Sequence, residues 1–115
     1  MFRIGIIGSN FGVFGLMPAF ESVNNCKVVA VCAQKSEQLD NYCKHTGSKN
    51  IYSDWRLLLE NENLDAIAIA VTPNAQYQIA KTAMAKGLDV FAEKPLAANL
   101  TQARELLALA RKKKI

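Results

Sequence analysis

The feature that most constrains the fold is a regular alternation of two kinds of segment along the chain. Short apolar runs, rich in β-branched residues, alternate with longer stretches whose apolar residues recur at helical spacing. The strand-like runs are Phe2 to Gly8, Lys27 to Cys32, Asn50 to Tyr52, Asp65 to Val71 and Leu88 to Ala92. Such alternation favours a parallel sheet that is covered on both faces and joined by right-handed crossovers. We therefore expect residues 1–115 to form one α/β domain, a doubly wound parallel sheet in three layers.

Several residues predict where the helices begin and end. Ser36 and Ser53 are expected to cap two helices, because a serine oxygen can accept a bond from a free N–H group of the first turn. Pro73 suits the first turn of a helix that runs to about Lys86, and the helix after the first strand is expected to reach about Asn24. Helices are also expected to end at Gly47 and Gly87. The last helix, Asn99 to Lys113, carries apolar residues at helical spacing: Leu100, Ala103, Leu106, Leu107 and Ala110.

The distribution of charge narrows the classes of partner. The formal net charge is +4, but Arg111 to Lys114 form one basic run at the end of a helix, where cations complement the helix dipole. The other ten basic residues balance ten acidic ones, and the body has no basic stripe interleaved with aromatic residues. We therefore expect no nucleic acid as a partner. No apolar run reaches transmembrane length, so no membrane partner is expected either.

Cysteine and histidine usage favours free thiols over a metal site. Cys26, Cys32 and Cys43 form no CxxC pair, and His45 is the single histidine. We expect no metal ligands and three free thiols in a reducing cytoplasm. No signal peptide is recognised before the first strand, in keeping with a cytoplasmic location.

A glycine-rich turn follows the first strand, at Gly8, Ser9, Asn10, Phe11 and Gly12. The dinucleotide-binding fingerprint of Rossmann folds needs a glycine at the tight turn, a small residue near the pyrophosphate and a glycine where helix and strand pack. Gly8 suits the first role and Gly12 the third, whereas Asn10 stands where the second glycine is expected. The turn follows a strand and opens a helix, which favours phosphate binding at the helix N-terminus. A purely structural turn, with no dinucleotide, is the alternative.

The end of the second strand bears on which dinucleotide is bound. An acidic residue there would bind both ribose hydroxyls of NAD and repel the 2′-phosphate of NADP. The chain instead has Ala33, Gln34, Lys35 and Ser36, with no acid before Glu37. Amide, ammonium and hydroxyl donors favour a 2′-phosphate, so we expect NADP in preference to NAD. The alternative is that Lys35 is an ordinary solvated loop charge.

Several segments resemble the glucose–fructose oxidoreductase / inositol dehydrogenase / rhizopine-catabolism (Gfo/Idh/MocA) family over essentially the whole chain. They are Gly5 to Gly8 with Pro18 to Phe20, Tyr52 to Leu59, Asp65 to Asn74, and Glu93-Lys94-Pro95 with Leu96-Ala97. The resemblance implies the N-terminal NAD(P)-binding Rossmann domain of an oxidoreductase. The chain departs from the family pattern at Asn10, at Ala33 in place of the usual acid, and at Tyr77 in place of a frequent histidine.

The resemblance extends the candidate site to the ends of two further strands. Val71, Thr72, Pro73 and Asn74 follow the fourth strand, where ligands bind in open α/β sheets, although an ordinary turn is the alternative. The resemblance implies that Lys94 is a catalytic residue that reaches substrate and nicotinamide ribose, that Glu93 fixes the local structure, and that the Lys94–Pro95 peptide is cis. Without these neighbours Lys94 would be read as a surface lysine.

The family implies a hydride transfer between nicotinamide and a carbinol carbon of a sugar, polyol or related small molecule. It also implies a C-terminal domain that supplies the substrate pocket, an Asp/His pair for proton transfer and a homo-oligomer interface. We expect residues 1–115 to lack that domain and to be inactive alone. We read it as part of a longer enzyme; the alternative is a stand-alone dinucleotide-binding sensor or regulatory module. Exposed apolar surface is expected where the missing half would lie.

Overall fold

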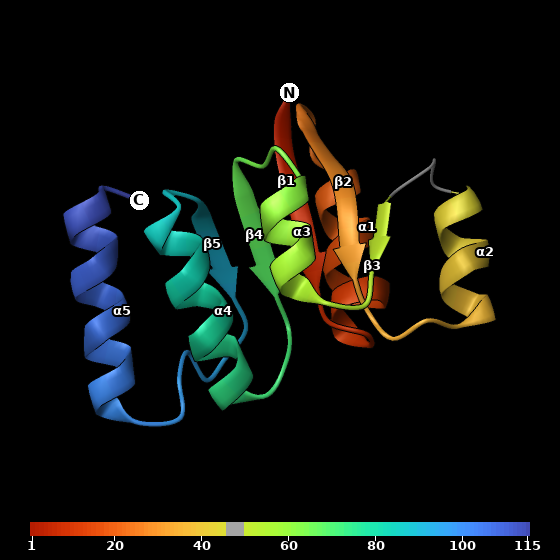
Figure 1. The fold of residues 1–115 in the computed structure, drawn as a ribbon. Coiled ribbons are helices and arrows are strands. Elements are labelled where there is room, and N and C mark those ends of the chain that lie inside the picture. Colours follow the sequence, from red (N-terminus) through yellow and green to blue (C-terminus); the bar gives the residue numbers. More distant parts are fainter. Residues whose placement is uncertain (46–49) are drawn as a thin grey trace.

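The computed structural model, which describes residues 1–45 and 50–115, has one sheet of five parallel strands (Figure 1). The strands are β1 (Phe2–Ile7), β2 (Cys26–Cys32), β3 (Asn50–Tyr52), β4 (Ala66–Ile69) and β5 (Asp89–Ala92). Their order across the sheet is β3-β2-β1-β4-β5, and every neighbouring pair is parallel. This is the order of the first five strands of a doubly wound dinucleotide-binding fold, so the predicted fold class is confirmed.

Helices cover both faces of the sheet and bury two separate cores. The helical elements are the π-helix η1 (Gly12–Leu16), which continues into α1 (Met17–Glu21), and α2 (Glu37–His45), α3 (Trp55–Asn61), α4 (Pro73–Ala85) and α5 (Leu100–Lys113). One core joins strand residues to η1, α1 and α2, and the other joins them to α3, α4 and α5. The strands buried on both faces read as continuous apolar runs for this reason.

The first helix differs from the prediction in its length and in its winding. It ends at Glu21, with Ser22 as its C-cap, and does not reach Asn24. Its first turns are wider than those of an α-helix, and the Met17 N–H donates to the Gly12 carbonyl, five residues back. Pro18 has no N–H to donate, so an ordinary α-helix would lack one bond at this place.

Two of the predicted helix caps can be compared with the structure, and one of them is wrong. Ser36 Oγ accepts from the Leu39 N–H at 3.0 Å, as predicted. The cap of α3 is Asp54 and not Ser53, because Asp54 Oδ1 accepts from the Arg56 N–H at 2.9 Å. A carboxylate is the stronger acceptor, and its negative charge suits a helix N-terminus. Gly47 lies outside the described residues.

The predicted ends of the last two helices are confirmed, but the apolar face of the last one is not. Gly87, with φ of +81°, follows Lys86, the C-cap of α4, and Asn99 caps α5 through a bond from the Gln102 N–H. Leu106 is buried, whereas Leu100 and Leu107 are 63% and 49% exposed. Helix α5 packs chiefly against α4 at the outer end of the sheet, so a narrow stripe is buried (Figure 1).

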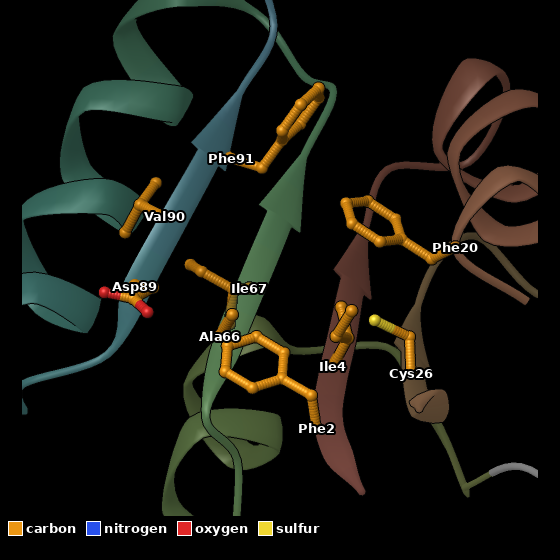
Figure 2. Close-up of a pocket in the computed structure, with 9 residues that line it drawn as sticks. All are labelled: Phe2, Ile4, Phe20, Cys26, Ala66, Ile67, Asp89, Val90 and Phe91. Atoms are coloured by element: carbon orange, nitrogen blue, oxygen red, sulfur yellow. The ribbon is translucent and has the colours of Figure 1, made fainter. Parts of the chain in front are cut away.

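An apolar groove of about 210 Å³ lies on the sheet between α1 and β5 (Figure 2). Phe20 of α1 and Phe91 of β5 meet across it edge to face, with ring centroids 5.5 Å apart. Phe91 and Phe2 are 51% and 41% exposed. This face of the sheet therefore exposes apolar surface, and whether a further domain covers it stays a prediction. Among the described residues, no helix is both long and apolar enough to cross a membrane.

Candidate functional site: a dinucleotide-binding edge

The predicted site residues follow the carboxyl ends of four neighbouring strands, which lie at one edge of the parallel sheet. Backbone bonds continue the sheet one residue past its strands. The Gly8 N–H donates to the Cys32 carbonyl at 3.0 Å, and the Ala70 N–H donates to the Ile7 carbonyl at 2.9 Å. The Glu93 N–H donates to the Ile69 carbonyl at 3.0 Å. These bonds fix where each turn leaves the sheet.

Gly8 meets the requirement for glycine at the tight turn. Its φ is +142°, a conformation that other residues rarely adopt. A Cβ at Gly8 would lie 2.4 Å from the Ala70 carbonyl oxygen, so the turn is closed against the backbone after β4. Gly12 is buried on β1, where an added Cβ would lie 3.4 Å from Ile6 Cγ2, an ordinary contact. The backbone therefore requires glycine at Gly8, whereas at Gly12 the structure has room for a Cβ.

The turn after β1 is joined to the end of β2 through a side chain. Ser9 Oγ accepts from the Gln34 N–H at 2.8 Å. Asn10 and Phe11 follow and are exposed, and the Asn10 carbonyl accepts from the Phe14 N–H at 2.9 Å. A helix that begins here leaves its first N–H groups without an acceptor inside the helix, as phosphate binding requires.

A first hollow, of about 220 Å³, lies between the ends of β1, β2 and β4. It is lined by predicted residues, Gly8, Ser9, Ala33, Gln34 and Val71, and by others that the sequence did not indicate, among them Ser53, Trp55, Ala75 and Ile79. The Arg56 guanidinium lies over the Trp55 ring, 4.3 Å from its centroid. Because Trp55 lines this hollow, its fluorescence is expected to change when a ligand occupies it.

A second, more polar hollow of about 190 Å³ lies beside the first, at the end of β2. Ser9, Asn10, Gln34 and Lys35 line it, together with Phe14, Ser36 and Gln38. None of these lining residues is acidic. The structure thus brings Lys35 together with the glycine turn, as the NADP hypothesis requires, and adds Gln38 to the predicted donors.

The turns after β4 and β5 form a further part of the edge, and Gln76 connects them. Thr72 is the N-cap of α4 and Pro73 its first residue, and the Gln76 N–H donates to the Thr72 carbonyl at 2.8 Å. Gln76 Nε2 donates to the Glu93 carbonyl and, at 3.0 Å, to the Pro95 carbonyl. The Lys94–Pro95 peptide is cis, as predicted. Lys94 is exposed and is not among the residues that line either hollow.

Sequence reasoning did not single out Gln76, although a signal was present. The residues three, four and seven positions later, Ile79, Ala80 and Ala83, are all apolar and buried. An amide in this stripe is a polar residue at a core position, which is unusual unless its hydrogen bonds are needed. Asn74, by contrast, was predicted. Its Oδ1 lies 3.5 Å from Gln102 Nε2, which links the turn after β4 to the start of α5.

Tyr77, which replaces a frequent family histidine, takes part in a contact between α4 and α5. Its hydroxyl donates to Glu105 Oε2. Lys81 Nζ lies 3.4 Å from the Tyr77 hydroxyl and 3.4 Å from the same Glu105 oxygen. The bond from Tyr77 and the charge of Lys81 lower the pKa of Glu105. The pKa of Lys81 is raised by its bond to the Tyr77 hydroxyl and by the charge of Glu105. The position therefore supports the packing of α5 on α4.

The thiol at the end of β2 remains protonated near neutral pH. Burial, and to a lesser degree the charge of Asp54, raises the pKa of Cys32 from 9.0 to about 11. A neutral buried thiol is a poor nucleophile and a poor metal ligand. No cluster of three or more histidine, cysteine or acidic residues able to hold a metal occurs within residues 1–45 and 50–115.

Comparison with known proteins decides the family. A family model described as "Oxidoreductase family, NAD-binding Rossmann fold" matches residues 2–115, almost the whole chain. The chain belongs to the Gfo/Idh/MocA oxidoreductase family. It is the NAD(P)-binding domain of such an oxidoreductase, and the resemblance seen in the sequence is confirmed.

Several relatives of this Gfo/Idh/MocA domain are named as dehydrogenases. D-apiose dehydrogenase of Paraburkholderia graminis is 28% identical over 107 residues, which cover 93% of this chain and 28% of the relative. The scyllo-inositol 2-dehydrogenase (NADP(+)) of Bacillus subtilis is 26% identical over 96% of this chain and 34% of the relative. The chain thus spans about a third of the length of these curated relatives.

Solved structures of similar fold include a complex with NADP. The 3-ketoreductase KijD10 of Actinomadura kijaniata, solved with TDP-benzene and NADP, superposes with a TM-score of 0.85. It is 25% identical, and the match covers 99% of this chain and 36% of the ketoreductase. The Gly8 turn, which a Cβ would fill, and the polar hollow beside it fit a dinucleotide pyrophosphate and ribose in this domain.

Proposed function

We propose that this domain binds NADP in preference to NAD. The observation that carries the proposal is the polar hollow at the end of β2, where Lys35 lies beside the glycine turn and no acidic residue lines the wall. A 2′-phosphate adds about two negative charges to the ribose, which an ammonium and neutral donors favour and a carboxylate would repel.

The hollow offers several donors to a phosphate at once. Lys35 supplies a point charge, and the amides of Gln34 and Gln38 supply neutral N–H groups. Ser36 Oγ accepts from the Leu39 N–H, so its own hydrogen is free to point elsewhere. Glu37, the first acid after β2, opens α2 and is not among the lining residues. Names of two relatives support the choice, since they specify NADP for an inositol dehydrogenase and for a ketoreductase complex.

For the parent protein we propose oxidoreduction of a carbinol carbon on a sugar, polyol or related small molecule. Bound nicotinamide would supply the hydride acceptor or donor. Lys94, at the end of β5, would be the catalytic residue of this domain, with Nζ donating a hydrogen bond to the substrate oxygen. The remaining length seen in relatives would supply the substrate pocket and the homo-oligomer interface. The three free cysteines support a reducing cytoplasm as the compartment.

Calorimetric titration of the chain with NADPH and with NADH tests the cofactor proposal. NADPH is expected to bind more tightly. Lys35→Ala is expected to weaken NADPH binding about tenfold, because it removes a charged donor to the phosphate. The same change should alter the affinity for NADH less than twofold, because NADH has no 2′-phosphate.

Lys44→Ala is the matched control, because Lys44 is also exposed and lies in α2 but does not line the polar hollow. It should leave both affinities unchanged. Tighter binding of NADH by the unmodified chain would contradict the preference for NADP. Equal losses for both cofactors in Lys35→Ala would show that Lys35 does not read the 2′-phosphate.

A further inference from the structure

Gln76 is the one buried polar side chain among the residues that the structure describes, at 1% exposure. It lies one turn into α4, on the face that Ile79, Ala80 and Ala83 bury in the core. An apolar side chain would suit this place better, because a buried amide loses its bonds to water. The amide must therefore be explained by what it bonds.

Both hydrogen bonds of the Gln76 amide go to the backbone on either side of Lys94. Nε2 donates to the carbonyl of Glu93 and to the carbonyl of Pro95, the latter at 3.0 Å. The backbone N–H of Gln76 donates to the carbonyl of Thr72, the N-cap of α4 in the turn after β4. One residue thus joins the turn after β4 to the turn that carries Lys94.

The amide oxygen of Gln76 indicates that the two bonds from Nε2 set the orientation of the amide. Gln76 Oε1 is buried and has no hydrogen-bond partner in the described part of the chain. Rotating the amide by half a turn would bring Oε1 against two carbonyl oxygens, which repel it. Buried polar atoms without partners are rare in native proteins, because each lowers stability. We infer that the two bonds from Nε2 offset the cost of leaving Oε1 without a partner.

We propose that Gln76 is a positioning residue that holds Lys94 at the nicotinamide end of the dinucleotide. This inference rests on the proposed function. The first hollow lies between the ends of β1, β2 and β4 and the second at the end of β2, whereas β5 is three strand spacings from β2, about 14 Å across the edge. A dinucleotide whose adenosine end lies at β2 extends towards Lys94 at β5. Gln76 therefore affects binding of the nicotinamide end only, and it does so by holding Lys94 in place.

Two probes separate the ends of the site. NADPH spans the whole edge, and adenosine 2′,5′-bisphosphate carries the adenosine end only. Gln76→Met keeps the length of the side chain and removes its donors. It is expected to weaken NADPH binding about three- to tenfold, as loss of a positioned hydrogen bond does. Binding of the bisphosphate should stay unchanged.

A double-mutant cycle then tests whether Gln76 acts through Lys94. Lys94→Ala should weaken NADPH binding and leave the bisphosphate unaffected, and adding Gln76→Met to it should cause no further loss. Gln78→Met is the matched control, since Gln78 is an exposed glutamine on the same helix. It should leave both affinities unchanged.

The outcomes separate this inference from the proposed function. If Lys94→Ala weakens NADPH binding and Gln76→Met does not, the positioning role is wrong and the proposed function stands. Parallel losses for NADPH and the bisphosphate in Gln76→Met would also overturn it, because they would mark a general structural role. Additive losses in the double variant would overturn action through Lys94. No NADPH binding by the unmodified chain would overturn both.

Discussion

Gly8 shows at the scale of one residue why the turn after β1 tolerates so little change. It combines φ of +142° with a carbonyl oxygen, that of Ala70, placed 2.4 Å from where a Cβ would stand. Asn10, at the position of the second fingerprint glycine, is exposed, so its side chain is not enclosed by the rest of the domain. The irregular match to the fingerprint thus keeps the one glycine that the backbone demands.

Replacing Gly8 by alanine is expected to destabilise the domain by about 3 kcal/mol, from backbone strain plus a contact that only a backbone shift can relieve. Gly87→Ala is the comparison, because Gly87 has φ of +81° and an added Cβ would meet nothing within 4 Å. It should cost about 1 kcal/mol, from strain alone. Urea denaturation of both variants measures the difference. Equal losses would mean that the contact with Ala70 is relieved without cost.

The position of a residue at the carboxyl edge was predictable where it follows directly from the end of a strand, and not where it depends on packing. Lys35 and Gln34 could be placed beside the glycine turn from sequence because they directly follow a strand that ends at the carboxyl edge of the sheet. Trp55 could not, because α3 brings it to the first hollow from another part of the chain, and Gln38 could not, because its place beside the second hollow depends on how the first turn of α2 is oriented. Gln76 was detectable in principle as an amide in an apolar stripe, but its two acceptors lie 17 and 19 residues further on.

At the scale of elements, apolar patterning predicted all five strands, with differences of one or two residues at their ends. Helix details were harder. The π-turns of η1 depend on Pro18 and on the packing of Gly12 against β1, which periodicity does not register. The exposure of Leu100 and Leu107 follows from the outer position of α5, which contacts α4 and leaves much of its own surface free.

Helix α3 offers a direct test of its cap. Asp54→Ala removes the side chain that accepts the Arg56 N–H at 2.9 Å, and is expected to lower the free energy of unfolding by about 1 kcal/mol. Ser53→Ala, at the position that the sequence suggested, should change stability by less than about 0.5 kcal/mol. Thermal unfolding of the two variants measures the difference. A larger loss of stability in Ser53→Ala than in Asp54→Ala would contradict Asp54 as the N-cap of α3.

At the scale of the whole molecule, the domain presents two contrasting surfaces. The carboxyl edge gathers glycine turns, donors and two hollows, whereas the groove between Phe20 and Phe91 is apolar (Figure 2). The chain also spans only about a third of the length of its relatives. The sheet order explains why dispersed motifs share one edge: parallel strands in the order β3-β2-β1-β4-β5 carry all their following turns to the same side.

We propose that a dinucleotide lies along this edge from the end of β2 to the end of β5. The most direct measurement is a nuclear magnetic resonance titration of the isotope-labelled chain with NADP⁺, following each backbone amide. We predict shifts that gather at residues 8–12 and 33–36, at Val71, Thr72 and Asn74, and at Glu93 and Lys94, with amides around Phe2 and Asp89 in the apolar groove little affected. Shifts that gather in the groove, or no shifts at saturating NADP⁺, would contradict it.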